Sequence, residues 1–131
     1  MAVLVDTNVI CDVLFNDPVW SEWSSTQLTQ HWGGLYINPI IYAELSYQAP
    51  SAKDVNHTME ALGLVYAELP VPSLFVAAQA YRSYRQRGGT KTAPLPDFFI
   101  GAHAQEAGLT LLTRDKARYE TYFPRARLIC P

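Results

Sequence analysis

The spacing of apolar residues along the chain predicts short buried strands followed by helices. Residues 2–5, Ala-Val-Leu-Val, form a continuous apolar run, which is typical of a strand with both faces buried. After Asp6, apolar residues recur at helical spacing as far as Leu14. An acid directly before such a pattern commonly caps the N-terminus of a helix. The sequence therefore opens with a predicted strand and a helix capped by Asp6.

The same succession continues along the rest of the chain. Capping and turn residues mark the boundaries, with Asn38-Pro39 and Ser51 before helices and Gly63 and Gly108 after them. The predicted helices cover about 19–30, 39–49, 51–62, 72–84 and 97–107, the predicted strands cover 35–37, 64–66, 109–113 and 128–129, and 88–92 is a predicted loop. Strands that alternate with helices predict an α/β fold, with a central parallel sheet covered by helices on both faces.

Two acids, Asp6 and Asp115, directly follow predicted strands. In open α/β sheets, ligand sites lie beyond the carboxyl ends of the strands where the strand order reverses, so these carboxylates share one crevice if their strands are neighbours. Glu44, within a predicted helix, and Asp97, at the start of another, are the other acids that we assign to this site. Each acid alone also has an ordinary explanation, as a helix cap, a solvated helix residue or a turn residue. Their joint placement favours a shared site.

Several carboxylates in one crevice repel one another and raise one another's pKa unless a cation neutralises them. Mg²⁺ suits carboxylate and water oxygens and leaves positions open for a substrate phosphate. Zinc is disfavoured, because the three histidines lack the spacing of a ligand pair and two cysteines cannot form a thiolate cluster. We predict a Mg²⁺ site that Asp6 and Asp97 bind directly, while Glu44 and Asp115 bind the metal directly or through water.

The chemistry predicted for such a site is in-line attack of metal-bound water on a phosphodiester. Thr7, Asn8 and Thr113 adjoin the acids in the sequence and are candidates to orient the carboxylates or the attacking water. Hydrogen bonding in caps and turns is the alternative role of these three residues.

The net charge of −2 conceals a strong asymmetry along the chain. Residues 1–81 hold eight acids and one base, whereas residues 82–131 hold nine bases and four acids. The basic excess suits a rim that contacts nucleic-acid phosphates around an acidic centre, with an ordinary solvated surface as the alternative. The candidate phosphate contacts are Arg82, Arg85, Arg87, Lys91, Arg114, Lys116 and Arg118.

Length and composition suit one globular domain over residues 1–131. The chain has no basic and apolar leader segment, and no stretch approaches the ~18 apolar residues of a membrane span, so we expect a cytoplasmic protein without a membrane segment. Cys11 and Cys130 form no C-x-x-C pair, and we expect both to be reduced thiols, with Cys11 buried.

The segments around the acids resemble the motifs of PIN-domain ribonucleases. Residues 3–10, Val-Leu-Val-Asp-Thr-Asn-Val-Ile, resemble the opening motif of that family, and residues 111–115, Leu-Leu-Thr-Arg-Asp, resemble its T-x-D motif at a strand end. Residues 97–104 resemble the helix that carries the third acid, and Glu44 falls where the second is expected. The likeness runs nearly from end to end. Gly101 is a departure, because family members often have Ala there, and we expect the packing of the helix to tolerate it.

The short chain most resembles the VapC-type toxins within this family. The resemblance implies a five-stranded parallel sheet, a homodimer, Mg²⁺ or Mn²⁺ at the four acids, and endonucleolytic cleavage of RNA. It also implies a cognate antitoxin protein that blocks the site.

Other functions remain open at this stage. A PIN-domain nuclease that processes RNA without an antitoxin, and a PIN domain that only binds, fit the same motifs. Receiver domains and haloacid-dehalogenase-type phosphatases also have acidic pockets at strand ends, but they carry further acids after the first strand, where this chain has Thr7 and Asn8. Trp20, Trp23 and Trp32 are expected to pack in the core, with an aromatic groove for an antitoxin helix as the alternative.

Overall fold

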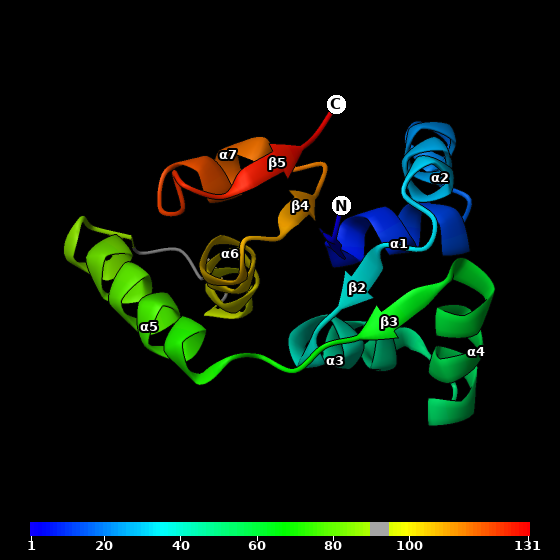
Figure 1. Ribbon diagram of the computed structural model, residues 1–131, viewed down its shortest axis with the longest axis horizontal. Helices are drawn as coiled ribbons and strands as arrows, with labels where there is room; N and C mark the ends of the chain where they lie inside the picture. Colours follow the sequence, from blue (N-terminus) through cyan, green and yellow to red (C-terminus); the bar gives the residue numbers. More distant parts are fainter. Residues whose placement is uncertain (90–94) are drawn as a thin grey trace.

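The computed structural model describes residues 1–89 and 95–131, in which five strands alternate with seven helices (Figure 1). The strands are β1 (Val3–Val5), β2 (Leu35–Ile37), β3 (Leu64–Tyr66), β4 (Thr110–Leu112) and β5 (Arg127–Ile129). The helices are α1 (Thr7–Leu14), α2 (Ser21–Gln30), α3 (Pro39–Gln48), α4 (Ala52–Leu62), α5 (Val71–Gln86), α6 (Leu95–Ala107) and α7 (Lys116–Glu120). The predicted loop over 88–92 lies partly outside the described residues.

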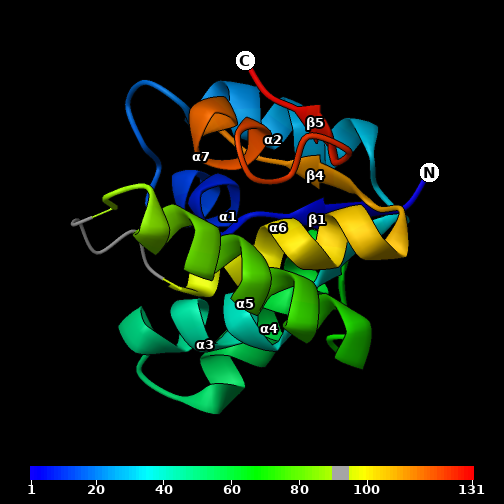
Figure 2. The ribbon, with the colours of Figure 1, turned by 90° about the vertical axis from the view of Figure 1, so that its left-hand side faces the viewer.

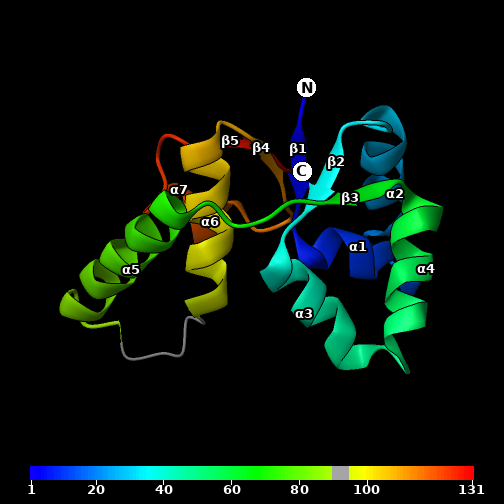
Figure 3. The ribbon, with the colours of Figure 1, turned by 60° about the horizontal axis from the view of Figure 1, so that its bottom comes forward.

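All five strands run parallel, in the order β3-β2-β1-β4-β5. β1 is the central strand, and its three residues are fully buried, as the apolar run at this position predicts. α1 and α2 lie on one side of the sheet, and α5 and α6 lie on the other (Figures 1 and 3). The predicted α/β fold, with five parallel strands covered by helices on both faces, is confirmed.

The strand order reverses between β1 and β4. The chain first adds β2 and β3 on one side of β1 and then returns to add β4 and β5 on the other side. β1 and β4 are therefore neighbours, with Val5 opposite Leu112, so their carboxyl ends adjoin. α1 and α6 begin on the side of the molecule where β1 ends (Figure 2). This edge of the sheet is the expected place for a ligand site in an open α/β fold.

Most helix boundaries follow from local hydrogen bonding. The side chains of Asp6, Asn38 and Ser51 each accept a backbone N–H at the start of a helix, which confirms the predicted caps. Gly63 ends α4 in the left-handed conformation at φ 66°, which glycine adopts without steric cost.

α2 begins two residues later than predicted. The carboxylate oxygen Oδ1 of Asp17 accepts the N–H groups of Val19 and Trp20, both at 2.9 Å. These bonds hold a turn ahead of the helix, which starts at Ser21. An acid that accepts the N–H groups of the second and third residues after it can thus delay the start of the helix that follows.

α7 is not predicted by the sequence pattern, because five residues are too few to show a helical period. Asp115 caps this helix by accepting the backbone N–H of Arg118 at 3.2 Å. Tyr119 on α7 is fully buried, and Phe123 just beyond it is almost so. The short helix therefore anchors the segment after β4 to the core.

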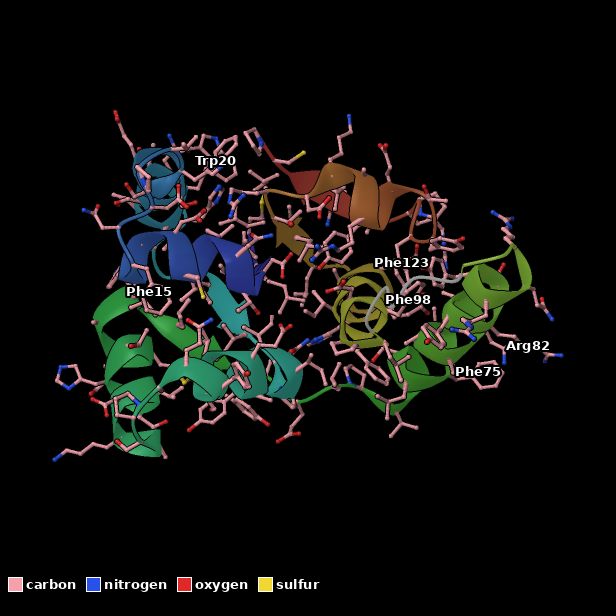
Figure 4. The ribbon with its side chains drawn as sticks, turned by 180° about the vertical axis from the view of Figure 1, so that it is seen from behind. Phe15, Trp20, Phe75, Arg82, Phe98 and Phe123 are labelled. Atoms are coloured by element: carbon pink, nitrogen blue, oxygen red, sulfur yellow. The ribbon has the colours of Figure 1, made fainter. Side chains whose placement is uncertain are left out.

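Gly101 is explained by the packing of Phe123. A Cβ at position 101 of α6 would collide with the Phe123 ring. Phe123 also packs edge to face on Phe98, with ring centroids 6.0 Å apart (Figure 4). Glycine at this position therefore allows an aromatic ring to approach the backbone of α6, so close packing depends on Gly101 and does not merely tolerate it.

The prediction that Cys11 is buried is wrong, because its side chain is half-buried and lines a groove between α1 and α3. Both cysteines are free thiols, as predicted. None of the helices in the described residues is both long enough and apolar enough to span a membrane.

Candidate functional site

Asp6 occupies the end of β1, buried beneath the start of α1 with 3% of its surface exposed. Its oxygen Oδ1 accepts the N–H of Thr7 at 2.8 Å. Its oxygen Oδ2 accepts the hydroxyl groups of Thr113 at 2.8 Å and Tyr119 at 2.9 Å, and the Asn8 amide nitrogen lies 3.4 Å away. With three donors on Oδ2 and one on Oδ1, the carboxylate is fixed in orientation, and Oδ1 keeps the spare acceptor capacity.

Glu44 is brought to this site by α3. The Thr7 hydroxyl donates to Glu44 Oε1 at 2.5 Å, while the Thr7 N–H donates to Asp6. Thr7 thus connects the two acids, which come from positions 38 residues apart in the sequence. The second oxygen of Glu44 accepts no hydrogen bond from the described residues.

Asp97 and Asp115 form the other side of the site, with the Arg118 guanidinium in contact with both. Arg118 Nε lies 3.4 Å from Asp97 Oδ2 and 3.0 Å from Asp115 Oδ2. The Asp97 side chain is 8% exposed, whereas the side chains of Asp115 and Arg118 are 37% and 44% exposed. Arg118, a candidate phosphate contact, therefore neutralises two of the predicted metal ligands.

The four acids interact electrostatically as one group. Burial raises the pKa of Asp97 to about 6, with Arg118 opposing the rise and Asp6, Glu44 and Asp115 adding to it. Burial also raises the pKa of Asp6, and burial with the nearby Asp6 charge raises that of Glu44, although hydrogen bonds lower both in part. The carboxyl groups of Asp6, Glu44 and Asp97 are therefore harder to ionise than in water, and an added positive charge would relieve this cost.

The chemistry of these donors fits a hard divalent cation, because all are carboxylate oxygens and no histidine or cysteine is among them. Within residues 1–89 and 95–131, no three acidic, histidine or cysteine side chains stand close enough together to hold a metal ion. The positive charge at the site is supplied by Arg118, which pairs with Asp97 and Asp115. The acids suit such a cation in ligand type and in charge, and their side chains would have to move closer together to bind it.

The three polar residues predicted beside the acids each contact at least one of them. Thr7 bonds to both Asp6 and Glu44, and Asn8 and Thr113 bond to Asp6. Thr113 also accepts the backbone N–H of Asp115 at 3.0 Å. The structure thus links the ends of β1 and β4 through hydroxyl and amide groups.

The predicted phosphate contacts differ in their exposure and in their partners. Arg82, Arg85, Arg87 and Lys116 have exposed side chains, and Figure 4 shows Arg82 extending outward from α5. Lys91 lies outside the described residues. The Arg114 side chain, in contrast, forms an ion pair with buried Asp12, which is described next.

Asp12 is an acid that the sequence reasoning missed. It is 3% exposed on α1, and its oxygen Oδ2 accepts Arg114 Nε at 2.7 Å and the Ser24 hydroxyl at 2.6 Å. The Arg114 guanidinium also stacks over the Trp20 ring, 5.3 Å from its centroid. Asp12 and Arg114 are 102 residues apart, and no local spacing signals that they meet.

Tyr119 is the second residue that sequence reasoning missed. Its hydroxyl donates to Asp6 from α7, and burial together with the negative charges nearby raises its pKa, so it remains a donor. The available signal was an aromatic residue four positions after Asp115, but it is informative only once α7 is known.

Comparison with known proteins identifies the family. The family model described as "PIN domain" matches residues 3–124. The chain belongs to the PIN-domain family. The receiver and phosphatase alternatives are therefore wrong. No protein with a curated description matches the sequence.

Solved structures with this fold include proteins from several bacteria. DNA-bound VapBC from Salmonella typhimurium is similar, with 20% identity, coverage of 99% of this chain and 98% of that chain, and a TM-score of 0.74. A toxin-antitoxin complex from Klebsiella pneumoniae has 22% identity, coverage of 99% and 98%, and a TM-score of 0.72. FitAcB from Neisseria gonorrhoeae has 25% identity, coverage of 97% and 96%, and a TM-score of 0.67.

Proposed function

We propose that this PIN domain is a VapC-type toxin, an endoribonuclease that hydrolyses RNA with Mg²⁺, or Mn²⁺, at Asp6, Glu44, Asp97 and Asp115. The observation that carries the proposal is the pairwise bridging of these acids, which come from four separate segments near the point where the strand order reverses. Thr7 bridges Asp6 and Glu44, and Arg118 bridges Asp97 and Asp115. When bound, a divalent cation would neutralise the acids and the phosphate and would activate water for attack.

The residues of the chain suit distinct tasks at such a site. Asp6 offers Oδ1, because its other oxygen is saturated by three donors. Glu44 offers the oxygen that Thr7 does not contact. Asp97 is buried and Asp115 is partly exposed, so we assign direct binding to Asp97 and binding through water to Asp115. Exposed Arg82, Arg85, Arg87 and Lys116, with Lys91, are proposed to contact RNA phosphates.

We also propose an antitoxin partner, since solved relatives of this fold are described as VapBC or toxin-antitoxin complexes. An apolar groove beside Glu44, lined by Leu14, Phe15, Leu45 and Val55, is suited to a protein segment that covers the acids. Phe15 at this groove is 59% exposed. The tryptophans of the predicted aromatic groove suit it less, because Arg114 covers Trp20 and Trp23 packs against the core. The prediction that Trp32 packs in the core is wrong, because this side chain is 61% exposed next to Gly33-Gly34.

A homodimer is the proposed oligomeric state. Val71, Leu74 and Phe75, at one end of α5, are exposed apolar residues, and Figure 4 shows Phe75 on the outer side of the helix. Such a patch of neighbouring apolar side chains supports an interface between copies of the chain.

The proposed chemistry is tested with Asp6→Asn and Asp97→Asn variants of the purified protein. We expect each variant to lose at least about 100-fold of Mg²⁺-dependent RNA cleavage, and chelation to abolish cleavage by the unmodified protein. Glu60→Gln, which changes an exposed acid on α4, is the matched control and should cleave normally. Cleavage by Asp6→Asn and Asp97→Asn at the normal rate would refute the proposal.

Expression in cells separates toxin from processing enzyme. A toxin should arrest growth, and a small protein encoded beside it should relieve the arrest. Cleavage activity in vitro without growth arrest would favour an RNA-processing nuclease that has no antitoxin.

A further inference from the structure

A hollow of about 540 Å³ lies beside the acids, between α3 and the first turn of α6. This volume falls within the range of ~300–1,000 Å³ that is common for small-ligand sites. Its lining is largely apolar, with Ile40, Ala43 and Tyr47 from α3 and Pro96 from α6.

The hollow is continuous with the acid site. Thr7 and Glu44, which are hydrogen-bonded to each other, both line it. Pro96, on the opposite wall, directly precedes Asp97. A group that occupies the hollow would therefore lie next to any phosphate held at the acids.

Tyr47 is the most exposed aromatic side chain at this place. It follows Glu44 by three residues on α3, so the two side chains lie on neighbouring positions of one helix face. Tyr47 is 89% exposed and makes no hydrogen bond or ring contact with the described residues. By contrast, Tyr81 packs on Phe98, and Tyr119 is fully buried. The open face of the Tyr47 ring is available to a ligand.

We propose that this hollow is a nucleobase subsite, in which an unpaired base next to the scissile phosphate stacks on Tyr47. The inference rests on the proposed ribonuclease function and deepens it by assigning one exposed aromatic residue to a base beside the scissile phosphate. Aromatic side chains bind unpaired bases by stacking, whereas a base inside a duplex is already stacked and paired. Ile40, Ala43 and Pro96 contact the edge of the base and exclude water from it.

A nucleobase fits this hollow better than a protein segment does. The hollow opens directly on Glu44 and Thr7, where the backbone of a bound RNA would pass. The apolar groove lined by Phe15 and Val55 adjoins the hollow at Glu44 and extends from there to α4, and it is the better surface for a protein. We therefore assign the hollow to the substrate and the groove to the partner.

The test compares Tyr47→Ala with Tyr47→Phe, which retains the ring. Trp32→Ala is the matched control, since Trp32 is 61% exposed and lies beside Gly33-Gly34, at the amino end of β2 rather than at the acids. The probe is a short single-stranded RNA that carries 2-aminopurine at each position in turn, because stacking quenches its fluorescence. Binding is measured in chelator, where no cleavage occurs, and KM and kcat are measured in Mg²⁺.

We expect quenching at one position with the unmodified protein, Tyr47→Phe and Trp32→Ala. Tyr47→Ala should lose the quenching. It should weaken RNA binding and raise KM by about 5- to 100-fold, with a smaller change in kcat. Duplex RNA should neither quench nor compete. A melting temperature within a few degrees of the unmodified protein is expected, because the side chain is exposed.

Unchanged RNA binding by Tyr47→Ala would overturn the inference, and so would an effect confined to the antitoxin complex or to the oligomeric state. If Asp6→Asn abolishes cleavage while Tyr47→Ala behaves normally, the subsite fails and the ribonuclease function stands. If the unmodified protein neither cleaves nor binds RNA, both fail.

Discussion

Two arginines on the segment after β4 neutralise carboxylates in different ways. Arg114 pairs with buried Asp12, is itself 28% exposed, and lies over Trp20. Arg118, 44% exposed, contacts Asp97 and Asp115 at longer distances of 3.4 and 3.0 Å. The first pair is closed, with Ser24 completing its hydrogen bonds. The second is open to solvent and lies among an excess of acids, so we infer that another cation could replace the guanidinium. A structural pair and an exchangeable charge thus lie four residues apart.

Arg114→Ala should give the largest effect. It leaves the buried Asp12 carboxylate without its cation, and such a loss typically costs about 3–5 kcal/mol of unfolding free energy. Urea unfolding monitored by circular dichroism measures it. Adding Asp12→Asn should restore part of the stability, because the uncompensated charge is then removed. A loss below 1 kcal/mol for Arg114→Ala alone would show that the pair is not structural.

Asp97 should make metal binding and stability depend on pH. Its pKa of about 6 in the folded protein exceeds that of a free carboxyl, so ionisation destabilises the metal-free fold as pH rises from about 4 to about 6. Below about pH 6, Mg²⁺ competes with the proton, and affinity should fall up to about tenfold per pH unit. Calorimetric titration and thermal melts at pH 5.0 and 7.5 test both.

The control for this behaviour is Asp97→Asn, which cannot ionise. Without metal at pH 7.5 this variant should be more stable than the unmodified protein, and the difference should shrink toward pH 4. A variant that is less stable than the unmodified protein at pH 7.5 would contradict the raised pKa.

Arg118→Gln should have the smallest effect, and it should strengthen metal binding, whereas protonation of Asp97 weakens it. Removing the competing guanidinium should tighten Mg²⁺ binding about two- to fivefold, as expected for a partly exposed ion pair, with little loss of stability. Arg125→Gln, which removes an exposed pair with Glu106, is the matched control and should leave affinity unchanged. Weaker binding by Arg118→Gln would mean that the guanidinium supports the metal rather than competing with it.

Local elements of this fold were predictable because they depend on neighbours in the sequence. The caps at Asp6, Asn38 and Ser51 and the buried run of β1 follow from rules that act within a few residues. The delayed start of α2 and the presence of α7 were missed, since a turn held by Asp17 and a helix of five residues leave no periodic signal.

The sequence by itself determined the strands and most helix limits, because apolar periodicity and capping are local properties. It also predicted which four acids share the proposed metal site, from the spacing of motifs. Only the tertiary structure decided that Arg114 closes on Asp12, that Arg118 lies between Asp97 and Asp115, and that Tyr119 holds Asp6. The contact of Asp12 with Arg114 and that of Asp6 with Tyr119 each join residues more than 100 positions apart. Both form because β1 pairs with β4. Which of two similar arginines pairs with a buried acid and which stays open to solvent is therefore decided by the tertiary packing, which the spacing of residues does not encode.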